Sequence, residues 1–315
     1  MSEKPLSIAI SPQNDDYSES SPIAHNDTNN VYPKSTDRRK LFTGLAFSII
    51  CDVVILVILG ICTLCAELDV WKITVERGFF LDDRSIQLPY KSGNTVPSSV
   101  AAIVGIVLPL MVILAVDFMV FFKYRVVRKR TFKRTPLLLV QNCANSVYAF
   151  LLHIFIVLLL TITLKSFLGA LRPDFYWRCD PDLSKVEPGV NFITAEMQKT
   201  VCRGSARTII EGRKSTPSGH ASISMAGMFF AVLYLENIHY RRYFTALKPL
   251  LQFLLMLFAL GTAASRIVDH KHSMFDVCSG MLLAIVVALY FEFVVRRRHI
   301  TPLNKIFQFN ERKRE

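Results

Sequence analysis

Residues 265–276 read SRIVDHKHSMFD, a polar segment that joins two long apolar runs of the chain. Two more polar patches stand at the ends of other apolar runs, KSFLGALRP at 165–173 and PSGH at 217–220. We number the patches in chain order: the first is 165–173, the second is 217–220 and the third is 265–276. The fold depends on how the apolar runs are arranged, and the chemistry depends on where that arrangement places the three patches.

The apolar runs predict a membrane protein. Hydrophobic residues make up 51% of the 315-residue chain, yet its formal net charge is +12. A bilayer-spanning helix needs about 20 apolar residues, and apolar runs that alternate with basic clusters are typical of polytopic membrane proteins rather than soluble domains. We therefore expect an all-α integral membrane protein with six transmembrane helices, near residues 43–65, 99–122, 142–164, 218–236, 248–265 and 275–295.

Basic clusters predict the orientation of these spans. They lie at 38–40, 123–134, 241–248 and 296–298, at both ends of the spanning region and in two of the connections. Because basic residues near helix ends favour the cytosolic side, both termini are expected in the cytosol. The loop 165–217 is also rich in Lys and Arg, which we interpret as functional charge. All three patches would then lie on the extracytoplasmic face at the bilayer surface, in what we expect to be the plasma membrane.

Three segments organise the chain. Residues 1–36 are rich in Ser, Asp, Asn and Pro, and we expect a disordered cytosolic tail because they can bury little apolar surface. Residues 37–298 form the predicted six-helix domain, and residues 299–315 form a basic cytosolic tail. Cys179 and Cys202 could form a disulfide in an oxidising compartment, with two free thiols as the alternative.

The cations of the patches suit a phosphate group. Lys165 and Arg172 belong to the first patch and Arg266 to the third. Arg can grip two phosphate oxygens at once, and Lys adds a point charge. Three converging cations could therefore stabilise a phosphoryl group during transfer. Each cation taken alone could equally extend from a membrane boundary to the lipid headgroups.

The second patch would begin the fourth span. Pro217 and Ser218 before an apolar run are a common helix start, so ordinary capping is the simplest interpretation. A helix N-terminus is also an anion site, because its free N–H groups point outward, and Gly219 would allow close approach of the backbone. His220 would then lie beside the phosphate, where an imidazole can donate a proton to a leaving alkoxide.

The third patch holds the expected nucleophile. His272 and Asp276 are four residues apart, and they would share a helix face if the sixth span began there. A carboxylate bonded to one ring nitrogen orients the imidazole and leaves the other nitrogen free to attack. His270 is a rival, but it lacks an acid four residues further on.

Other chemistries fit these residues less well. His270, His272, Asp269 and Asp276 superficially resemble metal ligands, but the surrounding cations would repel a dication, so we expect no metal and no cofactor. Ser218 as a hydrolase nucleophile lacks the context of a nucleophile elbow. Polar residues within spans could form an ion pathway, although structural pairing is favoured; they are Asp52, Asp117, His153 and Glu292.

The three patches, read as K-x6-RP, PSGH and SR-x5-H-x3-D, resemble the signature of the type-2 phosphatidic acid phosphatase superfamily. Residues 77–90 and 179–204 add to the likeness, because they resemble two outer loops of the animal lipid phosphate phosphatases. The resemblance covers about residues 37–298. It implies a six-helix fold and metal-independent hydrolysis of lipid phosphate monoesters at an outward-facing site.

The resemblance also implies residue roles. His272 would be the nucleophile, His220 the general acid and Asp276 the partner of His272. The phosphate-binding positions would be Lys165, Arg172, Ser218, Gly219 and Arg266.

We expect a two-step reaction through a phosphohistidine. The expected substrates are phosphatidate, lysophosphatidate, sphingosine 1-phosphate and ceramide 1-phosphate, which would enter laterally from the outer leaflet. The partners are then lipids and the bilayer, without nucleic acid, and the formation of a homo-oligomer stays open. The alternatives are a lipid phosphotransferase of the sphingomyelin synthase type and a non-catalytic cell-surface protein that binds lipids or mediates adhesion.

Overall fold

The computed structural model describes residues 35–70, 73–128, 135–236 and 246–296. The chain divides into two units, residues 1–49 and 50–315. Helix α1, Ser35–Glu67, begins in the first unit and continues into the second. The predicted tails, 1–36 and 299–315, lie outside the described residues, except that positions 35 and 36 open α1.

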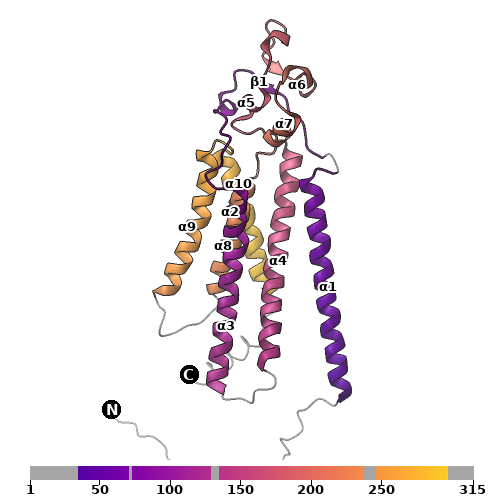
Figure 1. Cartoon of the computed structure of the whole chain (residues 1–315), viewed down its shortest axis with the longest axis vertical. Coiled ribbons are helices and arrows are strands. Elements are labelled where there is room, and N and C mark those ends of the chain that lie inside the picture. The colour runs from indigo at the N-terminus through magenta and orange to yellow at the C-terminus, as the bar shows by residue number, and fades with distance from the viewer. Residues whose placement is uncertain (1–34, 71–72, 129–134, 237–245, 297–315) are drawn as a thin grey trace, which may run out of the picture. The chain divides into compact units, whose positions relative to one another are not determined.

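Long helices dominate the second unit and run side by side in Figure 1. In an apolar environment each backbone N–H and C=O must find its partner within the chain, and a helix satisfies both locally. Two π-helical segments extend long helices: η2, Ile103–Val107, joins the short α2, Ser98–Ala102, to α3, and η4, Phe291–Arg296, follows α10. The long helices are α3 (Leu108–Arg128), α4 (Thr135–Leu168), α8 (Gly219–Glu236), α9 (Leu247–Val268) and α10 (Met274–Tyr290).

Five helical segments of the described chain are long and apolar enough to cross a membrane. Each overlaps one of the six predicted spans, so the chain is a multi-pass membrane protein. They are Ile49–Glu67, Ser98–Phe122, Leu139–Leu168, Leu247–Val268 and Met274–Val294.

The remaining predicted span, 218–236, coincides with helix α8, which is not among these five segments. Its first turns carry His220 and Ser222, and Glu236 ends it. The reason lies in its position, because α8 packs against α3, α4, α9 and α10 and buries much of its surface among them. A helix enclosed by protein needs fewer large apolar side chains than one that faces lipid.

Close helix packing surrounds α8. A Cβ placed on Gly227 would lie 1.8 Å from the carbonyl oxygen of Gly105, so only glycine allows the two backbones to approach this closely. Ile113, Phe150 and Met225 are fully or almost fully buried and form part of one apolar cluster between the helices. This packing determines the position of α8, which carries the second patch at its N-terminus.

Polar residues inside the helices are paired. Asp117 is 2% exposed and accepts a hydrogen bond from Asn142 Nδ2 at 2.7 Å and another from the Tyr234 hydroxyl. His153 Nε2 lies 3.3 Å from the Ala226 carbonyl oxygen. These contacts agree with the structural pairing that the sequence favours for Asp117 and His153.

Two loop regions, residues 73–97 and 169–217, fold together as a cap at one end of the long helices (Figure 1). Strands β1, Phe79–Phe80, and β2, Phe192–Ile193, pair antiparallel with Phe79 opposite Ile193. Phe79 and Ile193 are buried around Phe175. The cap therefore has a small apolar core of its own. Its helical elements are η1 (Arg84–Ile86), α5 (Phe175–Cys179), η3 (Leu183–Lys185), α6 (Ala195–Val201) and α7 (Ala206–Gly212).

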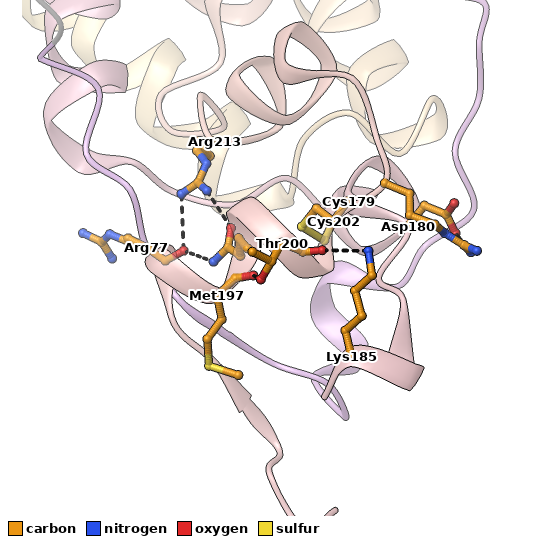
Figure 2. The surroundings of a disulfide bond; sticks show 10 residues. Arg77, Cys179, Asp180, Lys185, Met197, Thr200, Cys202 and Arg213 are labelled. Atoms are coloured by element: carbon orange, nitrogen blue, oxygen red, sulfur yellow. Dashed lines mark hydrogen bonds and ion pairs between the residues drawn. A yellow bond between two sulfur atoms is a disulfide. The ribbon is translucent and has the colours of Figure 1, made fainter. Parts of the chain in front are cut away.

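A disulfide joins Cys179 and Cys202 within the cap, with their Cα atoms 4.7 Å apart (Figure 2). Nearby, Arg213 Nη2 donates to Gln198 Oε1 at 2.6 Å, and Gln198 Nε2 donates to the Arg77 carbonyl oxygen at 2.8 Å. Gln198 thus connects the two cap regions. These bonds hold the chain that leads from the first patch to the second.

Candidate active site

All three patches lie where the long helices meet the cap. Lys165 is in the last turn of α4, Ser218 immediately precedes α8, and Arg266 is in the last turn of α9. The Ser218 N–H donates to the Asp276 carbonyl oxygen at 2.9 Å, which joins the second patch to the third. A Cβ on Gly219 would lie 3.3 Å from Lys165 Nζ, so the first patch is adjacent as well.

Arg172 is buried and held by an acid of the cap. It is 8% exposed, and its Nη1 donates to Glu211 Oε1 at 2.9 Å. Its Nε is buried and has no hydrogen-bond partner among the described residues. Glu211 is ionised, because Arg172 and Arg178 outweigh the effect of burial and lower its pKa. Arg172 is therefore oriented by one side of its guanidinium and keeps a free donor.

Arg266 is likewise buried and held by neighbouring groups, and it has more partners than Arg172. It is 2% exposed, and its Nη1 donates to the Val96 carbonyl oxygen at 3.1 Å. Its Nη2 donates to Asn94 Oδ1 at 2.8 Å and lies 3.4 Å from Asp269 Oδ2. Its Nε also lacks a partner among the described residues. Two buried arginines thus each retain an unbonded Nε–H, the donor that an anion can use.

Two polar side-chain atoms of the second patch have no hydrogen-bond partner among the described residues. Ser218 is fully buried, and its backbone carbonyl accepts the first helical bond of α8, from the Ser222 N–H. The capping predicted for its side chain is not seen, because Ser218 Oγ makes no hydrogen bond with a described residue. The same holds for His220 Nε2. A buried hydroxyl and a buried imidazole nitrogen at a helix N-terminus can serve a bound anion.

His272 and Asp276 lie close together, but His272 Nδ1 makes no hydrogen bond with a described residue, and the approach has a reason other than the one predicted. Helix α10 begins at Met274, so His272 precedes the helix rather than lying on its face. Ser273 is the N-cap, and Asp276 folds back in a capping box to accept from the Ser273 N–H at 2.7 Å. This turn brings His272 Nδ1 to 3.8 Å from Asp276 Oδ2.

Asp276 is fixed by residues next to the second patch. Ser215 Oγ donates to Asp276 Oδ2 at 2.7 Å, and the Thr216 hydroxyl donates to Asp276 Oδ1. With the Ser273 N–H, three donors therefore orient the carboxylate. At Gly280, one turn further along α10, an added Cβ would lie 2.6 Å from the Ser218 carbonyl oxygen, so the two segments are in close contact.

The surroundings of His272 keep its imidazole neutral. The side chain is almost fully buried, and burial lowers its pKa well below 6.5. Lys165, Arg172 and Arg266 lower it further, and so does His220. A neutral imidazole has the lone pair that a nucleophile needs. His270, the rival nucleophile, instead places its Nδ1 3.1 Å from the Pro89 carbonyl oxygen in the first cap region.

A buried ion network supports these groups and was not foreseen from the sequence. Asp174 accepts from Arg178 Nε at 2.7 Å and from Arg178 Nη2 at 3.0 Å, and Lys271 Nζ lies 3.4 Å from the same carboxylate. Lys271 Nζ also lies 4.1 Å from the centre of the Tyr90 ring. The network joins the loop after the first patch to the centre of the third.

Comparison with known proteins identifies the family. Residues 146–299 match the PAP2 superfamily. The chain is 34% identical over 220 residues to phospholipid phosphatase 1 of Mus musculus, which covers 68% of this chain and 75% of the relative. It is 33% identical over 228 residues to phospholipid phosphatase 2 of Bos taurus, covering 71% of this chain and 75% of the relative.

The chain belongs to the lipid phosphate phosphatase family. This confirms the resemblance noted from the three patches, and it makes the chain a phosphatase. The superfamily match begins within α4 and runs past the end of α10, so it includes all three patches. No solved structure matches the chain.

Several residues that bond to the candidate site residues of this lipid phosphate phosphatase were not predicted from the sequence. Ser215 and Thr216 adjoin the PSGH patch, and that adjacency was an available signal. Glu211 had no sequence signal beyond its charge. Asp269 was considered only as a metal ligand, whereas it pairs with Arg266. The contacts of Asn94 and Thr95 span about 170 residues of sequence and leave no local pattern.

Proposed function

We propose that this protein hydrolyses lipid phosphate monoesters by a metal-independent, two-step reaction through a phosphohistidine. One observation carries the proposal: His272 is buried beside two buried arginines, Arg172 and Arg266, whose Nε atoms have no partner among the described residues. The positive charges of Lys165, Arg172 and Arg266 also lower the pKa of His272, which favours its neutral form. Cations alone would only bind a phosphate. A neutral imidazole among cations can also attack the phosphate that they hold.

Phosphate binding uses the donors that the protein leaves unbonded. Arg172 Nε, Arg266 Nε and Ser218 Oγ are buried without partners among the described residues. Lys165 and the backbone of Gly219 at the start of α8 complete the set, because Lys165 Nζ adjoins that turn. A bound phosphoryl group would satisfy these donors, and its charge would be offset by the three cations.

In the first step, His272 Nε2 attacks phosphorus, and the bond from phosphorus to the lipid oxygen breaks. His220, protonated once the negative charge of the bound phosphate offsets the nearby cations, gives its proton to that oxygen, so the lipid leaves as an alcohol. Asp276, 3.8 Å from Nδ1, faces the positive charge that develops on the ring of His272. In the second step, water gives a proton to His220 and attacks phosphorus, which releases inorganic phosphate and regenerates His272.

The names of the relatives and the place of the site support lipid substrates. The relatives are phospholipid phosphatases, and the candidate site lies where apolar helices end. We propose phosphatidate, lysophosphatidate, sphingosine 1-phosphate and ceramide 1-phosphate as substrates. With α8 as the sixth span, both termini would be cytosolic, and the site would face outward from the plasma membrane.

The test is phosphate release from phosphatidate by the purified full-length protein in mixed micelles, with and without EDTA. His272→Ala is compared with His270→Asn, a matched change two residues away. Asn suits position 270 because His270 has a φ of +57°.

We expect wild-type activity to survive EDTA, His272→Ala to abolish it, and His270→Asn to retain most of it. Loss of activity in EDTA would overturn the metal-independent reaction. Equal activity of wild type and His272→Ala would overturn His272 as the nucleophile. Phosphate recovered on a second lipid, rather than in water, would instead indicate a phosphotransferase.

A further inference from the structure

The segment 91–96 of the first cap region, called the strap, lies against the third patch. Lys91 Nζ donates to the Val268 carbonyl oxygen at 2.6 Å, at the end of α9. The Lys91 carbonyl oxygen in turn accepts from Lys271 Nζ. These bonds join residues 177 and 180 positions apart. The strap is therefore attached at the end of α9 and within the turn that connects α9 to α10.

The strap holds Arg266 directly. Both terminal nitrogens of the guanidinium are bonded to it, Nη1 to the Val96 carbonyl oxygen and Nη2 to Asn94 Oδ1. Each terminal nitrogen is engaged, and Nε is the guanidinium nitrogen that has no partner among the described residues. The direction in which Arg266 presents Nε thus depends on a segment about 170 residues earlier in the chain.

Thr95 adds an indirect connection through Asp269. The Thr95 N–H donates to Asp269 Oδ2 at 2.9 Å, and the Thr95 hydroxyl donates to Asp269 Oδ1 at 2.6 Å. The same carboxylate pairs with Arg266 Nη2 at 3.4 Å. Both oxygens of Asp269 are therefore oriented by one threonine, and the carboxylate in turn orients the guanidinium.

The strap also reaches His220. The Val96 backbone, whose carbonyl oxygen accepts from Arg266, also interacts with the His220 imidazole. One peptide group of the strap thus contacts both a proposed phosphate-binding cation and the proposed general acid. A shift of the strap would move the two groups together.

We propose that Asn94, Thr95 and Asp269 are positioning residues for the reaction, which fix Arg266 and His220 relative to the bound phosphate. The inference rests on the proposed function. Arginine binds a phosphate well only when its planar guanidinium is correctly oriented. A misplacement of about 1 Å can cost up to about a hundredfold in rate. The strap supplies that orientation without touching the phosphate.

The test compares three single variants of the full-length protein. Thr95→Val keeps the shape of the side chain but removes its hydroxyl, and Thr95→Ser keeps the hydroxyl. Ser92→Ala is the control within the strap, because Ser92 is exposed and makes no side-chain hydrogen bond with the described residues. The readouts are kcat and KM for phosphatidate, the inhibition constant of inorganic phosphate and the melting temperature.

We expect Thr95→Val to raise both KM and the inhibition constant of phosphate by about tenfold, with little change in melting temperature. Thr95→Ser should restore both constants, and Ser92→Ala should match wild type. Unchanged phosphate inhibition in Thr95→Val, or failure of Thr95→Ser to restore it, would overturn the inference. These outcomes require an active wild type, so an inactive wild type would instead overturn the proposed function.

Discussion

Replacement of Asp276 by asparagine tests the central pair of the proposed mechanism. The change keeps the shape of the side chain but removes a negative charge 3.8 Å from His272 Nδ1. The fold should tolerate it. The amide oxygen can still accept from Ser215 and the Ser273 N–H, and the Thr216 hydroxyl can rotate to accept from the new NH₂ group. The main effect is then expected on catalysis.

The size of the effect follows from the distance between the two groups. A full charge on the attacking imidazole, 3.8 Å from a carboxylate, gains about 4 kcal/mol at an effective dielectric constant of about 20. If about half the charge has developed in the transition state, the loss is about 2 kcal/mol. The rate of formation of the phosphohistidine should therefore fall roughly 30-fold, and up to about 1,000-fold if the full charge has developed.

The assay is acid-quenched trapping of the phosphoenzyme from radiolabelled phosphatidate, beside the steady-state release of phosphate. Ser215→Ala is the matched control, because it removes one hydrogen bond to the same carboxylate and leaves the charge. We expect the control to lose less than about tenfold in rate.

An Asp276→Asn protein that is folded and forms phosphoenzyme within about threefold of the wild-type rate would refute the role of the charge. A loss as large in Ser215→Ala would show that orientation, rather than charge, is what Asp276 provides. The melting temperature of each variant separates both outcomes from unfolding.

Three further predictions follow from the cap and from the charges around the site. Cys179→Ala opens a disulfide between residues 23 positions apart and should destabilise the cap by about 3 kcal/mol; limited proteolysis of the cap checks this, and equal protease resistance with and without reductant in the wild type would contradict it. Glu211→Gln should raise KM several-fold, because the carboxylate orients Arg172; the glutamate is 57% exposed, so the effect is modest, and an unchanged KM would show that Arg172 is held without it. Since burial and then Lys165 hold the pKa of His272 well below 6.5, activity should not fall as the pH passes down through that value. Lys165→Met should raise the pKa of His272 and move the acid limb of the pH–rate profile to higher pH; an unmoved limb would count against an electrostatic effect of Lys165 on His272. The same sign applies to folding: below pH 6.5 the unfolded chain binds a proton that folded His272 does not, so this contribution to stability decreases as the pH falls.

Local sequence was enough to predict that the three patches lie at the ends of long helices. Apolar runs of membrane-spanning length place Lys165, Ser218 and Arg266 at helix ends, and the chain returns to the same end with every second crossing. The same rule that locates spans by composition treated α8 like the others, although it packs among four neighbouring helices and is not one of the five segments of membrane-spanning character. Composition reports how apolar a helix is but not whether lipid or protein surrounds it.

The detailed geometry of the site depended on contacts that composition cannot express. Helical spacing predicted that His272 and Asp276 would meet, yet α10 begins after His272, and the capping box at Ser273 produces the approach. Ser215 and Thr216 reach Asp276 across about 60 residues. A spacing of four residues limits the distance between two side chains, but it does not specify the turn that joins them.

By itself, then, the sequence determined the membrane class, the family and the identity of the groups that could act on a phosphate. These properties follow from hydropathy and from short motifs, which are local in the chain. Only the tertiary structure decided how those groups are held: Glu211 accepts a hydrogen bond from Arg172, and the strap and Asp269 bind Arg266. Such pairings join distant segments whose meeting depends on the packing of the whole helical unit, and a single sequence leaves no periodic trace of them.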